Sequence, residues 1–171
     1  MSPHTVTVQL ENKPGALARV SQLFARRGYN IQSLAVGPTE RPDISRLTLR
    51  VDCSEHSIEQ IEKQMHKLVN VLRVNELEAG EAIERELALL KVNAPADRRG
   101  ELLALAEVFS ARVADLGPNA IIFEVVGSPE ELDSFEELVR PHGLKALART
   151  GRIGLARAST ARAPKRQHVL R

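Results

Sequence analysis

The 171-residue chain has little of several residue types, and each shortage excludes a class of protein. Its single cysteine, Cys53, cannot form an internal disulfide, so a reducing cytoplasm is the expected setting. No apolar run approaches the roughly 18 residues that a membrane span requires, and the N-terminus has no signal or transit pattern. Tryptophan is absent and aromatic residues make up 3%, which argues against a surface that stacks nucleic-acid bases.

Acidic and basic residues nearly balance, at 22 and 24, but they are unevenly distributed. Residues 157–171 contain five of the basic residues and no acidic one, which leaves 19 basic against 22 acidic residues in the body. This segment is poor in large apolar residues, so we predict a basic, disordered tail. It is either a solvated extension or a weak electrostatic contact for an acidic partner or nucleic acid.

Groups suited to catalysis or metal binding are sparse. The five histidines show no His-x-x-x-His spacing, Cys53 has no cysteine partner, and Walker, GxGxxG and GxSxG motifs are absent. We therefore predict that the chain is not an enzyme by itself and has no catalytic residue and no metal site. Gly151-Arg152-Ile153-Gly154 resembles the GXXG clamp of an RNA-binding fold, but it follows a strand, and we predict a turn there.

Hydropathy patterns predict the order βαββαβ twice, with a junction near residues 78–81. In residues 1–78, strands are expected at 5–11, 30–36, 47–51 and 71–77, with helices after Gly15 and after Ser57. In residues 79–156, strands are expected at 86–92, 112–116, 120–126 and 144–149, with helices after Asp97 and Ser128. The predicted fold class is α+β: two ferredoxin-like units, each a four-stranded antiparallel sheet with two helices on one face.

Several residues are expected to fix the helices. Asp97 can cap its helix, and capping boxes are indicated by Ser57 with Gln60 and by Ser128 with Glu131. The last helix should bury one apolar stripe: Leu132, Phe135, Leu138 and Val139. Units this small are marginally stable alone and expose edge strands, so we expect a homodimer.

The most informative segment is Asn12-Lys13-Pro14-Gly15-Ala16-Leu17, between the first strand and the first helix. A helix start has unpaired N–H groups and a positive partial charge, and Gly15 has no side chain to keep a ligand away from them. A small carboxylate could therefore bind there. Alternatively, Pro-Gly only turns the strand into the helix.

This segment also resembles the signature of ACT domains, which bind amino acids and regulate metabolic enzymes. Longer blocks resemble the small, regulatory subunits of acetolactate synthase (acetohydroxyacid synthase) over roughly residues 4–157. The blocks that resemble this family are Asn12 to Val20, Arg27 to Leu34, Ser45-Arg46, Gln60 to Val74, Glu84 to Leu87, and Gly151 to Leu155.

The resemblance implies a function that the residue patterns alone do not. Such subunits bind and activate a catalytic subunit and confer feedback inhibition by valine in branched-chain amino-acid biosynthesis. This chain would carry no cofactor, whereas thiamine diphosphate, Mg²⁺ and FAD are expected on the catalytic subunit. Valine would lie between two ACT domains, the first being residues 1–78, and would contact Asn12, Gly15, Ala16, Leu17, Asn30 and Ile31.

Two features of the sequence depart from the family pattern, and one other function stays open. The corresponding turn of the second unit, residues 93–98, lacks Pro-Gly, so no amino-acid site is expected there. The alternative function is a free-standing ACT-type amino-acid sensor that acts on another partner or on nucleic acid. The resemblance does not account for the basic tail.

Overall fold

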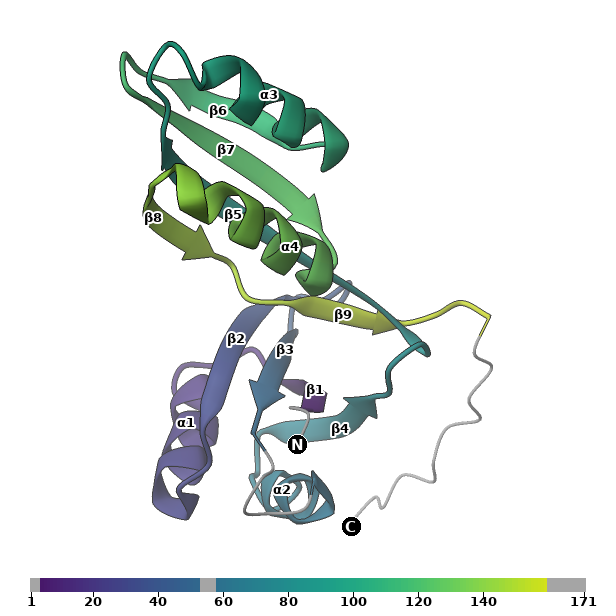
Figure 1. Ribbon diagram of the computed structural model, residues 1–171. Coiled ribbons are helices and arrows are strands. Elements are labelled where there is room, and N and C mark those ends of the chain that lie inside the picture. The colour runs from purple at the N-terminus through teal and green to yellow at the C-terminus, as the bar shows by residue number, and fades with distance from the viewer. Residues whose placement is uncertain (1–3, 53–57, 160–171) are drawn as a thin grey trace.

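A computed structural model describes residues 4–52 and 58–159, which form two units, each a sheet with helices (Figure 1). The first unit contains β1 (His4–Glu11), α1 (Ala16–Arg27), β2 (Ile31–Pro38), β3 (Ile44–Val51), α2 (Ile58–Met65) and β4 (Val71–Leu77). The second contains β5 (Ala82–Asn93), α3 (Arg99–Val108), β6 (Arg112–Leu116), β7 (Ala120–Gly127), α4 (Pro129–Val139), a 3₁₀ turn (Arg140–His142), β8 (Leu144–Arg149) and β9 (Ile153–Ala156). The predicted α+β fold of two ferredoxin-like units is confirmed.

The first sheet has the strand order β2-β3-β1-β4, and α1 and α2 cover one face of it (Figure 1). Alternation in β1 explains this layering, because Val6 and Val8 are fully buried within the core under the helices. Val8 lies across from Leu47 on β3 and from Val74 on β4, so the register aligns the apolar side chains of three strands. Helix α1 ends at Gly28, whose left-handed conformation (φ 70°) closes its last turn.

The second sheet has the order β6-β7-β5-β8, with α3 and α4 over one face (Figure 1). Its core includes Leu90, Phe123 and Phe135, and the rings of the two phenylalanines meet edge to face at 5.7 Å. Leu138, predicted to be buried, is instead 46% exposed. The apolar side chains that α4 buries include those of Leu132, Phe135 and Val139, whereas Leu138 lies outside the buried face of the helix.

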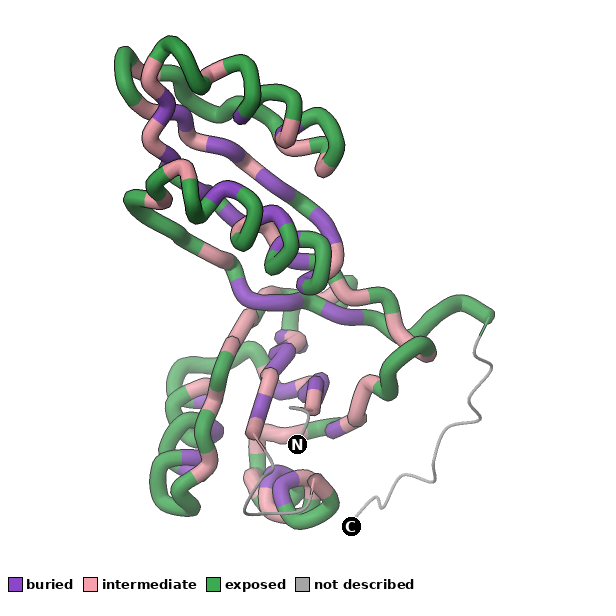
Figure 2. The backbone as a smooth tube through the Cα atoms, viewed as in Figure 1, coloured by how far each residue is buried: buried purple, intermediate pink, exposed green. Residues whose placement is uncertain are grey.

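The two units are joined by β5, which is longer than the predicted strand 86–92 and takes part in three ladders. Its C-terminal part pairs with β7 and β8, whereas Ala82 to Arg85 pair with β9. The prediction of a turn at residues 151–154 is therefore wrong, because Ile153–Ala156 forms a strand. In β9, Gly154 faces the first unit so closely that a Cβ there would lie 2.5 Å from Leu77 Cδ1. Figure 2 shows purple, buried backbone along this joint.

Only one of the predicted helix caps is confirmed. At α4, Ser128 Oγ accepts from the Glu131 N–H at 3.3 Å, and Glu131 Oε2 accepts from the Ser128 N–H at 2.6 Å. Asp97 does not cap α3, because the turn after Pro95 places Arg98 at the N-cap position, without a side-chain capping bond. Ser57 and Cys53 lie outside the described residues.

The capping box of α4 gives a first prediction. Ser128→Ala should lower the free energy of unfolding by about 1 kcal/mol, because the Glu131 N–H loses its acceptor. Ser134→Ala is the matched control in the same helix. Ser134 donates to the Glu130 carbonyl in the helix interior, where alanine is at least as favourable. Urea unfolding measures both, and equal losses would contradict the capping role.

Candidate effector site at the start of the first helix

The loop between β1 and α1 exposes the start of the helix. Gly15 is the N-cap residue, in a left-handed conformation with φ 83° and ψ −9°, and no side chain caps the helix. A Cβ at Gly15 would meet nothing within 4 Å, so the space in front of the helix start is open. Glycine suits this position because the conformation is strained for other residues.

Backbone donors are available at this helix start. The Ala16 N–H donates to the Lys13 carbonyl at 3.2 Å, whereas within residues 4–52 and 58–159 the N–H groups of Gly15 and Leu17 have no acceptor. The first turn of α1 contains no acidic residue. The N–H groups of Gly15 and Leu17 therefore remain available to an anion, supported by the positive end of the helix dipole.

Charged neighbours of the loop are paired with each other. Lys13 Nζ lies 3.1 Å from Glu11 Oε1, and this hydrogen bond, with a second from Asn70, lowers the pKa of Glu11. Arg41 donates to Asp43 at 2.8 Å and lowers the pKa of that carboxyl group. Because these charges offset each other locally, the N–H groups and the helix dipole dominate the attraction for a carboxylate.

Asn12 anchors the loop. Its N–H donates to the Asp43 carbonyl at 2.8 Å, and its Nδ2 donates to the Pro42 carbonyl at 2.9 Å. The loop before β3 thus fixes the orientation of the Asn12 amide, whose Oδ1 can still accept from an ammonium group. Sequence reasoning missed the role of Pro42, since a carbonyl contact across 30 residues leaves no local pattern.

The other residues predicted to contact valine lie at two separate places in the first unit. Leu17 and Ile31 are both partly buried against the first core, and Asn30 is exposed just before β2. Ile31 lies across from Val51, which lies across from His4, at the far end of the sheet from Asn12. The eight residues of β1 separate these ends by about 23 Å, at roughly 3.3 Å per residue. One chain therefore does not bring Asn30 and Ile31 to the loop.

The corresponding position of the second unit is built differently. Helix α3 has no glycine at its N-cap, and Arg99 Nη2 donates to the Pro118 carbonyl at 2.6 Å and the Ala94 carbonyl at 3.3 Å. A guanidinium group here ties the helix start to the neighbouring loop, as the Asn12 amide does in the first unit. A bulky cation thus occupies the start of α3, where the first unit has only backbone.

Two other kinds of site receive no support from the part of the chain that the structure describes. Within residues 4–52 and 58–159, no group of three or more His, Cys, Asp and Glu side chains could hold a metal ion. Over the same residues, no helix has the length and apolar character needed to cross a membrane.

Comparison with known proteins identifies related chains. Residues 6–73 match the family described as AHAS small subunit-like ACT domain, and residues 85–158 match the small subunit of acetolactate synthase. The probable acetolactate synthase small subunit of Archaeoglobus fulgidus is 45% identical over 156 residues, covering 91% of this chain and 98% of the relative. The acetolactate synthase small subunit of Mycolicibacterium smegmatis is 44% identical, covering 90% of this chain and 91% of the relative.

A solved structure gives the same result. The crystal structure of the acetolactate synthase small subunit from Thermotoga maritima superimposes with a TM-score of 0.82 at 37% identity, covering 92% of this chain and 98% of that chain. Both halves of the sequence and the arrangement of the whole chain therefore agree. The chain belongs to the family of acetolactate synthase small, regulatory subunits with an ACT domain.

Proposed function

We propose that this chain binds the catalytic subunit of acetolactate synthase, raises its activity and confers feedback inhibition by valine. The observation that carries the proposal is the open helix start at Gly15, with N–H groups free to bind a carboxylate. The related chains are named small subunits, which supports a larger partner that performs the reaction. Thiamine diphosphate, Mg²⁺ and FAD would belong to that partner, and this chain would contribute no cofactor.

In the proposed site, the three parts of valine meet different groups. The N–H groups of Gly15 and Leu17 hold the carboxylate, and Ala16 lets the ligand approach closely. The ammonium group is bound by Asn12 Oδ1 and by Asn30, and Leu17 and Ile31 enclose the isopropyl group. Leucine and isoleucine differ from valine by one methylene, which discriminates by only about 1–3 kcal/mol.

The site requires two chains, and the sheet register supports this. Strand β2 lies at the edge of the first sheet, and its last residue, Pro38, lies across from Ser45, which pairs with Leu10 near the loop. If the β2 strands of two chains associate in antiparallel directions, Ile31 of one chain approaches the end of β2, and hence the loop, of the other. A homodimer through this edge would thus assemble both halves of the site, twice.

Regulation follows from the position of the site between chains. Valine would favour one arrangement of the two ACT domains, and the catalytic subunit must prefer another for valine to inhibit. A coupling of about 1–3 kcal/mol is typical, and by reciprocity the catalytic subunit should weaken valine binding by the same factor. Exposed apolar side chains on β5 and β9, including Leu89, Ile153 and Leu155, support an interaction with a protein partner.

An acetolactate assay tests the proposal directly. The catalytic subunit alone, and the catalytic subunit with this chain, are assayed across a valine titration. We expect this chain to raise the rate and valine to lower it only when this chain is present. No activation, or acetolactate formation by this chain alone, would contradict the proposal. A pull-down that recovers nucleic acid or a transcriptional partner instead would favour the free-standing sensor.

A further inference from the structure

A cavity of about 470 Å³ lies between the two units, away from the start of α1. Strands β2 and β3 line one side with Gln32, Ser33 and Arg50, and the segment after β8 lines the other with Thr150, Gly151 and Arg152. Its lining includes three arginines, Arg50, Arg149 and Arg152. A space of this size and chemistry fits a small polar molecule.

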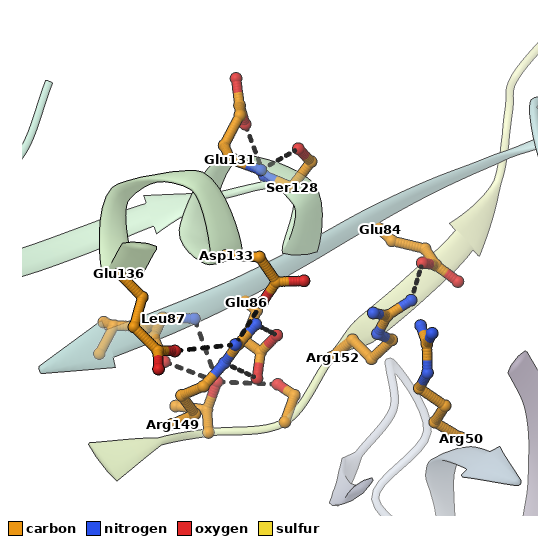
Figure 3. A network of polar contacts seen from close by, with 12 residues as sticks. Arg50, Glu84, Glu86, Leu87, Ser128, Glu131, Asp133, Glu136, Arg149 and Arg152 are labelled. Atoms are coloured by element: carbon orange, nitrogen blue, oxygen red, sulfur yellow. Dashed lines mark hydrogen bonds and ion pairs between the residues drawn. The ribbon is translucent and has the colours of Figure 1, made fainter. Parts of the chain in front are cut away.

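Two of the three arginines are already neutralised by carboxylates (Figure 3). Arg149 donates to both oxygens of Glu86, at 3.0 and 2.8 Å, and to Asp133 at 2.6 Å. These bonds raise the pKa of Arg149 above its ordinary value. Arg152 donates to Glu84 Oε2 at 3.0 Å. Both guanidinium groups therefore serve the joint between β5 and the segment that follows β8.

Arg50 is different. Its Nε donates to Gln32 Oε1 at 3.1 Å, but it forms no ion pair with any residue in 4–52 and 58–159. Figure 3 shows its guanidinium group directed toward that of Arg152. Burial, and then the charge of Arg152, lower the pKa of Arg50 from its ordinary value. Since arginine still stays protonated at neutral pH, this is a partly desolvated cation beside another cation.

A hydroxyl group that lines the cavity lacks a hydrogen-bond partner in the part of the chain that the structure describes. Ser33 Oγ is buried and makes no hydrogen bond within the described residues. It lies next to Gly151, where a Cβ would be 3.4 Å from this oxygen. A buried hydroxyl without a partner is uncommon in folded proteins and indicates an acceptor absent from the protein itself. Ser33 pairs with Arg50 across β2 and β3, so the two donors lie side by side on the same wall of the cavity.

We propose that this cavity binds a small monocarboxylate whose carboxylate accepts hydrogen bonds from Arg50 and Ser33. A guanidinium fork matches the two oxygens of a carboxylate. The pairing of charges favours a ligand with a single negative charge, because Glu84, Glu86 and Asp133 already offset Arg149 and Arg152, whereas Arg50 forms no ion pair within the described residues. A dianion such as phosphate would have one charge left without compensation. A bound carboxylate would touch both units and stabilise their present arrangement.

NMR titration of the full chain with acetate or pyruvate, against chloride at matched ionic strength, tests this proposal. We expect saturable shifts of the Arg50 side chain and the Gly151 amide with the carboxylates and none with chloride. Arg50→Ala should weaken binding about tenfold or more, because one charge-assisted contact is lost. Arg46→Ala is the matched control, since Arg46 lies on the same strand and the same face but outside the cavity.

Several results would overturn the proposal: no saturable shift at Arg50, an equal loss from Arg46→Ala, or tighter binding of inorganic phosphate than of acetate. Ser33→Ala, with a smaller loss expected, provides a second test if Arg50→Ala disturbs the fold. The Gly15 amide reports separately on the proposed valine site. Failure at one site is therefore visible independently of the other.

Discussion

Gly15→Asp is expected to abolish inhibition of the reconstituted acetolactate synthase by valine and to leave activation largely in place. The new carboxylate would project into the open space before the helix start, where the carboxylate of valine is proposed to bind. It would repel the ligand, occupy the free N–H groups and prevent close approach to the backbone. The measurement is the rate of acetolactate formation across a valine titration, with and without the substitution.

Gly15→Asn is the matched control for this experiment. Asparagine and aspartate have nearly the same size, and both tolerate the left-handed conformation, φ 83°, better than other side chains do. The two variants therefore share the backbone strain and differ in charge. We expect the asparagine variant to keep partial sensitivity to valine. Inhibition of the aspartate variant at unchanged valine concentrations would exclude this loop as the effector site.

Glu86→Gln should give the largest loss of stability among the polar substitutions considered, about 2–3 kcal/mol. Glu86 is 6% exposed, and both of its oxygens accept from Arg149. Glutamine keeps the shape but cannot accept through both positions, so a partly buried guanidinium loses its main counter-charge. Urea unfolding of the full chain measures the loss of free energy.

Asp133→Asn is the control, because Asp133 contacts the same arginine from an exposed position. The Asp133 side chain is 58% exposed, so solvent screens the contact, and we expect a loss below about 1 kcal/mol. A difference between the two variants would locate the stabilising charge pair at β5 and β8. Equal losses of unfolding free energy would mean that the total negative charge near Arg149 stabilises the fold, and not the buried pair with Glu86.

Local periodicity was sufficient to predict most elements of the fold. Strands such as Val71–Leu77 and Arg112–Leu116 have the bounds predicted from the sequence, and the Ser128 capping box is present. Such elements depend on alternation or on contacts within one helical turn. The prediction that Asp97 caps α3 was wrong because the turn after Pro95 shifts the start of the helix by one residue. No capping pattern in the sequence reveals such a shift.

Features that depend on distant pairing could not be predicted. Strand β9 is short, contains Gly154 and exists because it pairs with Ala82 to Arg85, about 70 residues earlier. The separation of Ile31 from the loop is likewise visible only from the register of β2 with β3. The cavity at Arg50 combines residues 32–34 and Arg50 of the first unit with Glu86, Asp133 and residues 149–152 of the second, which lie far apart in the sequence.

The chain leaves the second unit where it entered, because the Arg157 N–H donates to the Glu81 carbonyl at 2.9 Å and Arg157 Nε donates to the Gly80 carbonyl at the same distance. Residues 81–157 therefore resemble an inserted domain whose first and last residues are held together by hydrogen bonds. Such a segment can be excised, joined end to end or transplanted into a surface loop of another host without long connectors. A fluorescent label fused after residue 159 would begin beside the hydrogen bonds of Arg157. A label inserted in the Gly117–Asn119 turn would leave these hydrogen bonds undisturbed.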